Sequence, residues 1–467
     1  MKLYSKICVI LLVFVNISLA QNQIPKWENL FNGKDLKGWK LLNGKASYTV
    51  ENGEIVGRTV PNQPNTFLAT EKVYGDFIFE VDFKVDVHMN SGVQFRSEIK
   101  DEKDKCLVTD KRTPERVHGY QMEIDPSPRA WSGGIYDEAR RGWLYPMEYN
   151  PEAKSAFKNN QWNHYRIECI GNSIRTWVNG TPCAHLIDDM TPKGFIALQV
   201  HQISDAKDAG EEVRWKNVRI QTKNLKASAA DNLFVINAIP NNISDEEKKQ
   251  GVKLLWDGKT STGWRSAYKT TFPDSTWYIK DGTLNVKGGK GAESTNGGDI
   301  VTIQEFHAFD LQFEFQITDT ANSGVKYFVT EKENNAGSAI GLEYQILDDD
   351  KHPDAKLGSI GNRMMASLYD LIPAQKIYGS NNERREKIPV GEWNRGRIMV
   401  YPDGKVEHWI NGWKVLEYQR GTQYFYALVA KSKFVKWPNF GMAEKGHILL
   451  QEHGTHVAFR SIKIKEL

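Results

Sequence analysis

The chain has 467 residues, of which 40% are hydrophobic, 25% are charged and 11% are aromatic. This composition excludes a disordered, collagen-like or multi-spanning membrane protein, and the length suffices for at least two domains, each with its own core. The 61 Lys and Arg residues against 58 Asp and Glu residues leave a net charge of +3, without any run of five like charges. A nucleic-acid-binding surface is therefore not expected.

The first 20 residues predict a secretory signal. Lys2 and Lys6 precede an apolar stretch over residues 7–19, and Ser18-Leu19-Ala20 has the small-x-small form of a signal-peptidase site. The stretch is too short to span a bilayer comfortably, and no later segment is apolar for 18 residues, so we expect no membrane span. The pattern predicts an exported protein.

Three cysteines, Cys106, Cys169 and Cys183, follow the signal. The turns around Cys169 and Cys183 place these two residues on strands two apart and out of register, about 11–12 Å from each other, which is too far for a disulfide. An exported protein without a disulfide framework favours the bacterial periplasm.

An internal repeat organises the rest of the chain. Residues 90–93 (NSGV) recur at 322–325, residues 177–180 (WVNG) recur as 409–412 (WING), and residues 198–201 (LQVH) recur as 450–453 (LQEH). The offset rises from 232 to 252 residues, which predicts a 20-residue insertion near residues 424–440. We infer two domains, 21–223 and 251–467, that fold separately and are joined by a cleavable linker, 224–250, whose short helix begins at the capping box Ser244–Glu247.

Inside each copy the hydrophobic period is two. Residues 77–85 and 311–317 alternate between apolar and polar side chains, and Asn179-Gly180 and Asn411-Gly412 are typical of two-residue hairpins. Many short strands and hardly any helical periodicity predict an all-β protein in which each half is an antiparallel jelly-roll sandwich.

Several strands carry polar residues opposite their core positions. In the first copy these are Gln94, Arg96, Gln121, Glu123, Asp125, Gln199 and His201; in the second copy they are Glu343, Gln345, Gln451 and His453. An ordinary solvated sheet face is one interpretation. However, Gln, Glu, Asp, Arg and His are the residues that hold hydroxyl groups and move protons, which favours a site for carbohydrate chemistry.

Two further patterns concern carboxylates. A loop with Asp348 and Asp350 can ligate Ca²⁺ or another divalent cation through oxygen, or can be a solvated acidic turn. The Glu-x-Asp-x-x-Glu strand of jelly-roll glucanases is incomplete at Glu123 and at Glu80, which argues against a two-carboxylate glycosidase.

In several of these motifs, both copies resemble the 3-keto-disaccharide hydrolase family, and the resemblance covers nearly all of the chain after the signal. It rests on residues 30–39 (LFNGKDLKGW), 90–96 (NSGVQFR), 119–125 (GYQMEID), 133–137 (GGIYD), 343–348 (EYQILD), 367–370 (SLYD) and 451–454 (QEHG). It implies two tandem concanavalin-like jelly-roll sandwiches, export to the periplasm, and cleavage of glycosides that a separate dehydrogenase has oxidised to 3-ketones. The ketone acidifies the hydrogen on C2, so loss of that proton expels the C1 substituent.

Combining the resemblance with the predicted sheet faces, we expect the first copy to carry the better-equipped site. Glu123 is the expected base, His201 the expected acid and Arg96 the expected cation for the enolate, although the base and the acid can be exchanged. The second copy has Phe328 and Gln345 where the first has Arg96 and Glu123. The expected substrate-binding residues are Gln94, Gln121, Asp125, Trp131, Tyr136 and Gln199 in the first copy, with Glu343, Gln345, Tyr369, Gln451 and His453 in the second. The alternatives are a non-catalytic glycan-binding protein and a conventional glycosidase.

Overall fold

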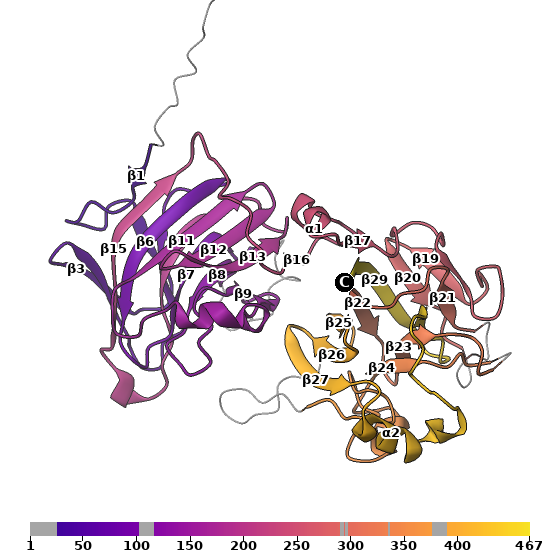
Figure 1. The fold of residues 1–467 in the computed structure, drawn as a ribbon. Helices are drawn as coiled ribbons and strands as arrows, with labels where there is room; N and C mark the ends of the chain where they lie inside the picture. Colours follow the sequence, from indigo (N-terminus) through magenta and orange to yellow (C-terminus); the bar gives the residue numbers. More distant parts are fainter. Residues whose placement is uncertain (1–25, 102–115, 290–293, 295–297, 335–336, 376–389) are drawn as a thin grey trace, which may run out of the picture.

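The computed structural model describes residues 26–101, 116–289, 294, 298–334, 337–375 and 390–467. The predicted signal and Cys106 therefore lie outside the described residues. The described chain forms two groups of strands, one from each copy, that meet near the linker (Figure 1).

The first domain contains two sheets that pack face to face. The larger sheet has the order β16 (Ile236–Asn237), β13 (Thr181–Ile187), β12 (Ser173–Val178), β11 (Asn163–Ile170), β6 (Phe77–Val85), β15 (Glu212–Gln221), β4 (Glu54–Arg58) and β3 (Ser47–Glu51), with β1 (Glu28–Asn29) paired to β15 and β16 parallel to β13. The smaller sheet is antiparallel and has the order β10 (Gly142–Tyr145), β9 (Ile135–Glu138), β8 (Val117–Ile124), β7 (Ser91–Ile99), β14 (Phe195–Val200), β5 (Thr66–Thr70) and β2 (Trp39–Asn43). The 3₁₀ helices η2 (Met147–Tyr149), η3 (Pro151–Ser155) and η4 (Ala206–Asp208) lie in loops.

The second domain repeats this architecture. Its larger sheet has the order β19 (Trp277–Lys280), β20 (Thr283–Val286), β29 (Val457–Glu466), β22 (Phe309–Ile317), β25 (Trp393–Val400), β26 (Lys405–Ile410) and β27 (Trp413–Gln419), with β17 (Lys253–Leu254) paired to β29. Its smaller sheet has the order β18 (Trp264–Ser266), β21 (Ile300–Thr302), β28 (His447–Leu450), β23 (Asn322–Val329) and β24 (Leu342–Leu347). A 3₁₀ helix, η5 (Pro353–Lys356), follows β24.

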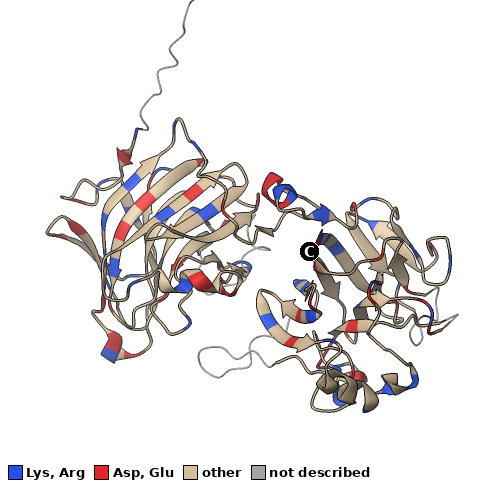
Figure 2. Ribbon diagram, in the orientation of Figure 1, with Lys and Arg blue, Asp and Glu red and all other residues tan. Residues whose placement is uncertain are grey.

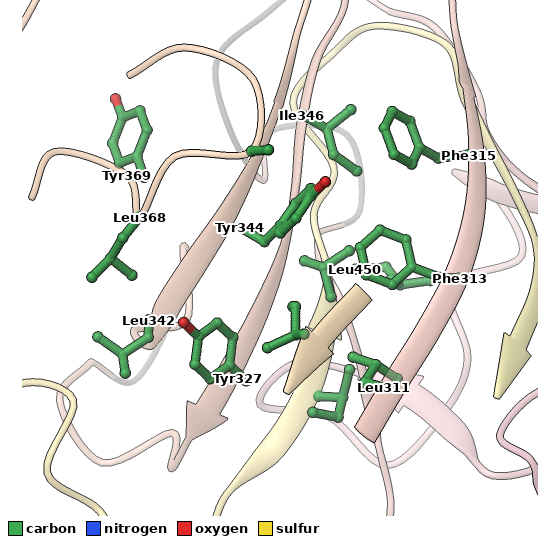
Figure 3. Packing of buried hydrophobic residues seen from close by; sticks show 14 of the residues in the cluster. Leu311, Phe313, Phe315, Tyr327, Leu342, Tyr344, Ile346, Leu368, Tyr369 and Leu450 are labelled. Carbon is green, nitrogen blue, oxygen red and sulfur yellow. The ribbon is translucent and has the colours of Figure 1, made fainter. Parts of the chain in front are cut away.

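Each sandwich encloses its own core. In the second domain, Phe313 and Phe315 of β22 face Tyr327 of β23 and Tyr344 of β24 across the space between the sheets (Figure 3). Burial of these aromatic side chains, with the rest of the core, holds the two sheets together. The predicted alternating strands are confirmed as β6 and β22, and both Asn-Gly dipeptides form two-residue hairpin turns.

The linker is more ordered than its composition suggests. Residues 236–237 add the parallel strand β16 to the first domain, and the short helix α1 (Asp245–Lys249) begins with the expected capping box at Ser244 and Glu247. Glu247, which is 2% exposed, accepts hydrogen bonds from Asn237 of the first domain at 2.6 Å and from Lys463 of β29 at 2.8 Å. A buried ion pair therefore joins the linker to the second domain.

The insertion in the second copy contains the helices α2 (Gln423–Ala430) and η6 (Lys433–Lys436). Thr422 caps α2 by accepting a hydrogen bond from the Phe425 amide at 3.2 Å. Among the described residues, no helix has the length and apolar character needed to cross a bilayer.

The outer face of the larger sheet of the first domain carries alternating charges. Figure 2 shows acidic and basic residues side by side across β6, β11 and β15. Glu80 of β6, for example, accepts hydrogen bonds from Arg166 at 2.8 Å and from Arg219 at 2.6 Å. On this face the charged groups pair with one another.

Candidate active site

The corresponding face of the smaller sheet is different, because its polar side chains are buried. Gln94 of β7 and Gln121 and Glu123 of β8 are 0%, 2% and 5% exposed, although their neighbours along the strands fill the core. The strands pair so that Gln94 lies opposite Gln121 and Gly92 lies opposite Glu123. For these residues the interpretation as an ordinary solvated face is wrong.

A chain of hydrogen bonds connects these side chains to one carboxylate. Ser97 Oγ donates to Gln94 Oε1 at 2.7 Å, Gln94 Nε2 donates to Gln121 Oε1 at 2.7 Å, and Gln121 Nε2 donates to Glu123 Oε2 at 2.9 Å. Asn90 Nδ2 donates to the other oxygen, Glu123 Oε1, at 2.7 Å. Both oxygens of Glu123 thus accept from neutral amides, which fixes the carboxylate without neutralising it.

The repeated Asn-Ser-Gly-Val motif builds this arrangement. Ser91 Oγ donates to the Gln199 carbonyl at 2.7 Å, and this bond joins β7 to β14. Gly92 leaves room for Gln121, since a Cβ atom at Gly92 would lie 2.5 Å from Gln121 Cδ. In the second copy Gly324 gives Glu343 the same room, with Glu343 Oε1 at 2.5 Å from the position of an added Cβ. The motif therefore joins neighbouring strands through its serine and makes room for the polar side chains of the site through its glycine.

Burial raises the pKa of Glu123 to about 7. The hydrogen bonds from Asn90 and Gln121 and the positive charge of Arg129 oppose this rise, while the neighbouring carboxylate of Asp125 adds to it. Arg129 Nη2 lies 3.5 Å from Glu123 Oε1. A carboxylate with a pKa near neutrality can both take up and return a proton at physiological pH.

The loop that follows β8 places Arg129 beside the site. Asp125, which is 2% exposed, accepts hydrogen bonds from Arg129 Nε at 2.7 Å, from the Ser127 amide at 3.0 Å and from the Trp131 amide at 3.2 Å. The expectation that Asp125 holds a sugar hydroxyl is therefore not supported, because its oxygens hold this loop. Trp131 is fully buried and donates from Nε1 to Glu148 Oε1 at 3.2 Å, so it does not line a sugar pocket as expected.

Arg96 does not point toward Glu123, and its expected contact with the enolate is wrong. The pairing of β7 with β8 shifts between Phe95 and Glu98, and Arg96 has a φ of 43°, so a β-bulge interrupts the alternation on which the prediction depended. The guanidinium donates to the carbonyls of Gly75 and Gly171, both at 2.9 Å, and to Asp76 Oδ1 at 3.0 Å. Arg129, which sequence reasoning missed, is the cationic side chain beside Glu123, with Nη2 at 3.5 Å from Oε1.

Four half-buried residues, Asn90, Arg129, Tyr136 and His201, form the exposed part of the site. His201 Nδ1 lies 2.8 Å from the Gln202 carbonyl, and because a carbonyl only accepts, Nδ1 carries the proton and Nε2 presents a lone pair. Burial, with the charges of Arg116 and Arg129, lowers the pKa of His201 and favours the neutral ring. The expected role of His201 as the acid stays a prediction.

Tyr136 and Gln199 have the hydrogen-bonding groups that a ligand needs. Burial, together with the charge of Glu123, raises the pKa of Tyr136, so its hydroxyl keeps its proton. The ring packs edge-on against Trp143 with centroids 5.1 Å apart. The side-chain oxygen and nitrogen of Gln199, which is 1% exposed, make no hydrogen bond among the described residues.

The second domain has a related but altered site. Lys326 takes the place of Gln94, Glu343 that of Gln121 and Gln345 that of Glu123 in the pairing of β23 with β24. Lys326 Nζ lies 4.0 Å from Glu343 Oε2 and 4.0 Å from Asp299 Oδ2. The Gln345 side-chain nitrogen can donate to Glu343 Oε1 at 3.1 Å. Compared with the first copy, the carboxylate lies two residues earlier on the strand, at Glu343, and Lys326 is its cationic neighbour.

Three other residues were expected to bind substrate in the second copy: Gln451, His453 and Tyr369. Gln451 is buried, and its carbonyl accepts from Ser323 Oγ at 2.9 Å, as Gln199 does from Ser91. The half-buried His453 lies 3.5 Å from Asn322 Nδ2. Tyr369 donates to Asp354 Oδ2 at 2.8 Å, so its hydroxyl is already engaged.

The acidic loop with Asp348 and Asp350 does not form a cation site in the described residues. Asp348 Oδ1 accepts from the amides of Asp350 and Lys351 at 3.2 and 3.3 Å, and Oδ2 accepts from the Thr320 amide at 2.9 Å. Nowhere in the described chain do three or more His, Cys, Asp or Glu side chains converge so as to hold a metal ion. Asp348 is 5% exposed and accepts from backbone amides, so the alternative of a solvated acidic turn does not describe it either. Cys169 and Cys183 are both buried and unpaired, as expected.

The family model described as the 3-keto-alpha-glucoside-1,2-lyase-like domain matches the chain in two segments, residues 26–221 and 251–465. The chain belongs to this family. The two segments coincide with the two sandwiches, and both smaller sheets carry the polar face described above.

Several known proteins are similar to this chain. A 3-keto-disaccharide hydrolase from Bacteroides thetaiotaomicron is 37% identical over 284 residues, which cover 56% of this chain and 91% of the relative. A putative glycosyl hydrolase structure from Parabacteroides distasonis is 30% identical and covers 49% of this chain and 99% of its own, with a TM-score of 0.41. The carbohydrate-binding module CBM66 from Bacillus subtilis is 16% identical and covers 39% of this chain and 95% of its own, with a TM-score of 0.27.

Proposed function

We propose that this protein cleaves glycosidic bonds in sugars that carry a ketone at C3, and that the first domain performs the chemistry. Membership of the 3-keto-alpha-glucoside-1,2-lyase-like family supports the substrate class. The observation that carries the assignment of the site is Glu123, a buried carboxylate with a pKa of about 7 that two neutral amides hold in place.

The proposed reaction is an elimination next to the ketone. The Glu123 carboxylate removes the proton from C2, and the electron pair of the C–H bond forms an enolate with its negative charge on the C3 oxygen. The enolate collapses, restores the ketone, forms a C1–C2 double bond and breaks the bond from C1 to the leaving oxygen. Water can then add across the double bond, which makes the overall reaction a hydrolysis.

The other groups of the site have matching roles. Arg129, 3.5 Å from Glu123, provides the positive charge that stabilises the enolate oxygen. The Tyr136 hydroxyl, which is protonated at neutral pH, gives its proton to the leaving oxygen. The Nε2 lone pair of His201 and the amide of Gln199 accept or donate hydrogen bonds to the sugar hydroxyls.

The neighbouring carboxylates do not support a conventional glycosidase. Such an enzyme needs a second carboxyl group that is available to the sugar. Asp125 is engaged by three donors of its own loop, and Glu138 forms a buried ion pair with Arg116. Of Glu123, Asp125 and Glu138, Glu123 is the carboxylate whose hydrogen bonds come from neutral amides, with Arg129 farther away at 3.5 Å.

The source of the substrate follows from its chemistry, and the location of the protein follows from its sequence. A 3-keto-glycoside must be made by oxidation of the C3 hydroxyl, so we propose that a sugar dehydrogenase supplies the substrate. The basic and apolar residues 2–20 and the small residues before Gln21 support export to the periplasm.

The proposal is tested by incubating the purified protein with a 3-keto-glucoside and with the same glucoside in unoxidised form, and measuring aglycone release. We expect release only from the ketone, and loss of release in folded Glu123→Gln. Glu343→Gln, the matched change in the second copy, measures any contribution of that domain. Release from the unoxidised glucoside alone, or normal turnover by Glu123→Gln, would refute the proposal.

A second candidate function concerns the second domain alone. Its Gln345 replaces the base and Lys326 lies near Glu343, which favours carbohydrate binding without cleavage. Calorimetric titration of Glu123→Gln with the 3-keto-glucoside should then find two binding sites per chain, and Lys326→Met should remove one of them. A single site that survives Lys326→Met would contradict this role.

A further inference from the structure

A hairpin of the second domain reaches the first domain next to the proposed active site. Trp413, the first residue of β27, lies with its ring centroid 4.9 Å from that of Trp131. The Trp413 side chain packs against the hydrophobic cores of both domains. Residues from the two copies, far apart in the sequence, therefore share one aromatic cluster.

The tip of the hairpin fits closely against the first domain. Gly412 has a φ of 86°, and a Cβ atom added there would lie 2.4 Å from Pro146 Cγ and 3.0 Å from Tyr149 Cε2. Before the tip, Trp409 stacks on Tyr149 with centroids 6.0 Å apart and planes at 9°. The equivalent Gly180 of the first copy has a φ of 82° but meets nothing within 4 Å, so the close fit belongs to the second-copy hairpin.

The aromatic cluster leads directly to the charged groups of the site. The guanidinium of Arg129 lies over the Trp131 ring at 4.6 Å and over the Trp143 ring at 5.0 Å. The Trp131 and Trp143 rings meet edge to face with centroids 4.4 Å apart. Trp413 covers the Trp131 ring, so it limits the positions that Trp131, and hence Arg129, can adopt beside Glu123.

We propose that Trp413 is a positioning residue for the active site of the first domain, and that it acts by holding Trp131 and thereby Arg129 against Glu123. The second copy is then part of the first copy's site, in addition to any ligand that it binds itself. The inference rests on the proposed function in taking Glu123 as the base, but it is tested without substrate.

The charged and titratable groups that face Glu123 come from two strands and one loop. Asp125 and Arg129 lie in the loop after β8, Tyr136 lies on β9, and Tyr165 of β11 donates from Oη to the Glu123 carbonyl at 2.6 Å. Of these groups Arg129 is the cationic one. Movement of Arg129 away from Glu123 therefore raises the pKa of Glu123, and this change reports the position of the guanidinium.

The experiment is a pH titration of the full-length protein by ¹³C NMR of glutamate side-chain carboxyl carbons, with Glu123→Gln used to assign the signal. In the unchanged protein we expect a midpoint at about 7. Arg129→Ala should raise the midpoint by about one pH unit or more, as expected for loss of an opposite charge at this distance. Trp413→Ala should raise it in the same direction, and should add nothing when Arg129 is already replaced by Ala.

Matched controls separate positioning from general damage. Trp393→Ala removes another half-buried Trp of the second domain, one that lies against Arg460 at 4.0 Å, and should leave the midpoint unchanged. Gly412→Ala should push the hairpin away from Pro146 and raise the midpoint, whereas Gly180→Ala, at an open turn, should not. Circular dichroism verifies folding, and Gly412→Ala serves if Trp413→Ala does not fold. A wild-type midpoint in folded Trp413→Ala or Gly412→Ala, or a further rise in the double variant, would overturn the proposal.

Discussion

Replacing Glu123 with Gln should change the pH dependence of stability in a way that follows from its burial. Burial raises the pKa of Glu123 from 4.5 to about 7, so the folded protein binds this proton more tightly than the unfolded chain does. The stabilising effect of the bound proton is fully present below pH 4.5 and is lost as the pH rises through 7. The loss amounts to about 3 kcal/mol, at about 1.4 kcal/mol for each pH unit.

A glutamine at position 123 carries no titratable proton, so the free energy of unfolding of the variant does not fall for this reason as the pH rises. We expect the free energy of unfolding of the wild-type protein to fall between about pH 4 and pH 8 by about 3 kcal/mol more than that of Glu123→Gln. Urea unfolding of both proteins at both pH values measures this difference, in which the contributions of all other titrating groups cancel. Parallel pH profiles for the two proteins would show that Glu123 titrates normally, and would refute the reasoning from burial.

Three other changes have expected outcomes. The kcat/KM for a 3-keto-glucoside should rise with pH through about 7, because Glu123 must lose its proton to act as a base, and a flat profile from about pH 6 to 9 would contradict this. Arg96→Ala should lower the free energy of unfolding by about 3 kcal/mol, since two carbonyls and Asp76 lose a donor, with little effect on turnover by the folded protein. Glu247→Ala should cost about 3–5 kcal/mol in urea unfolding by leaving Lys463 buried without its partner, and Glu247→Gln with Lys463→Met should recover part of this loss.

Hydrophobic alternation and hairpin dipeptides were sufficient to predict both sandwiches, since these features depend on short stretches of sequence. They also placed Gln94, Gln121 and Glu123 on one sheet face, because a regular strand presents every second residue to the same side. The same reasoning failed at Arg96, where a bulge follows Phe95 and changes the side to which the next residue points. A bulge depends on pairing with a second strand, so one strand's alternation gives no sign of it.

Arg129 was missed for a related reason. It lies in a loop, where no periodicity predicts the direction of a side chain, and its position depends on Asp125 and on the rings of Trp131 and Trp143. Asn90, by contrast, stands in the repeated Asn-Ser-Gly-Val motif, and its position beside Glu123 explains why a turn residue recurs there. The repeat therefore carried a signal for Asn90, which reasoning from the sheet faces did not select.

The two copies show how one backbone can support different chemistry. Both have a glycine that makes room for a long side chain on the next strand and a serine that ties the central strands together. In the first copy two neutral amides hold the Glu123 carboxylate and Arg129 Nη2 lies 3.5 Å away, and burial still raises the pKa of Glu123, which general-base catalysis requires. In the second copy Lys326 lies near the displaced carboxylate of Glu343, and an amide, Gln345, takes the place of the base. An amide cannot take a proton from carbon, so the second site, with Gln345 in the place of Glu123, is better suited to binding than to elimination.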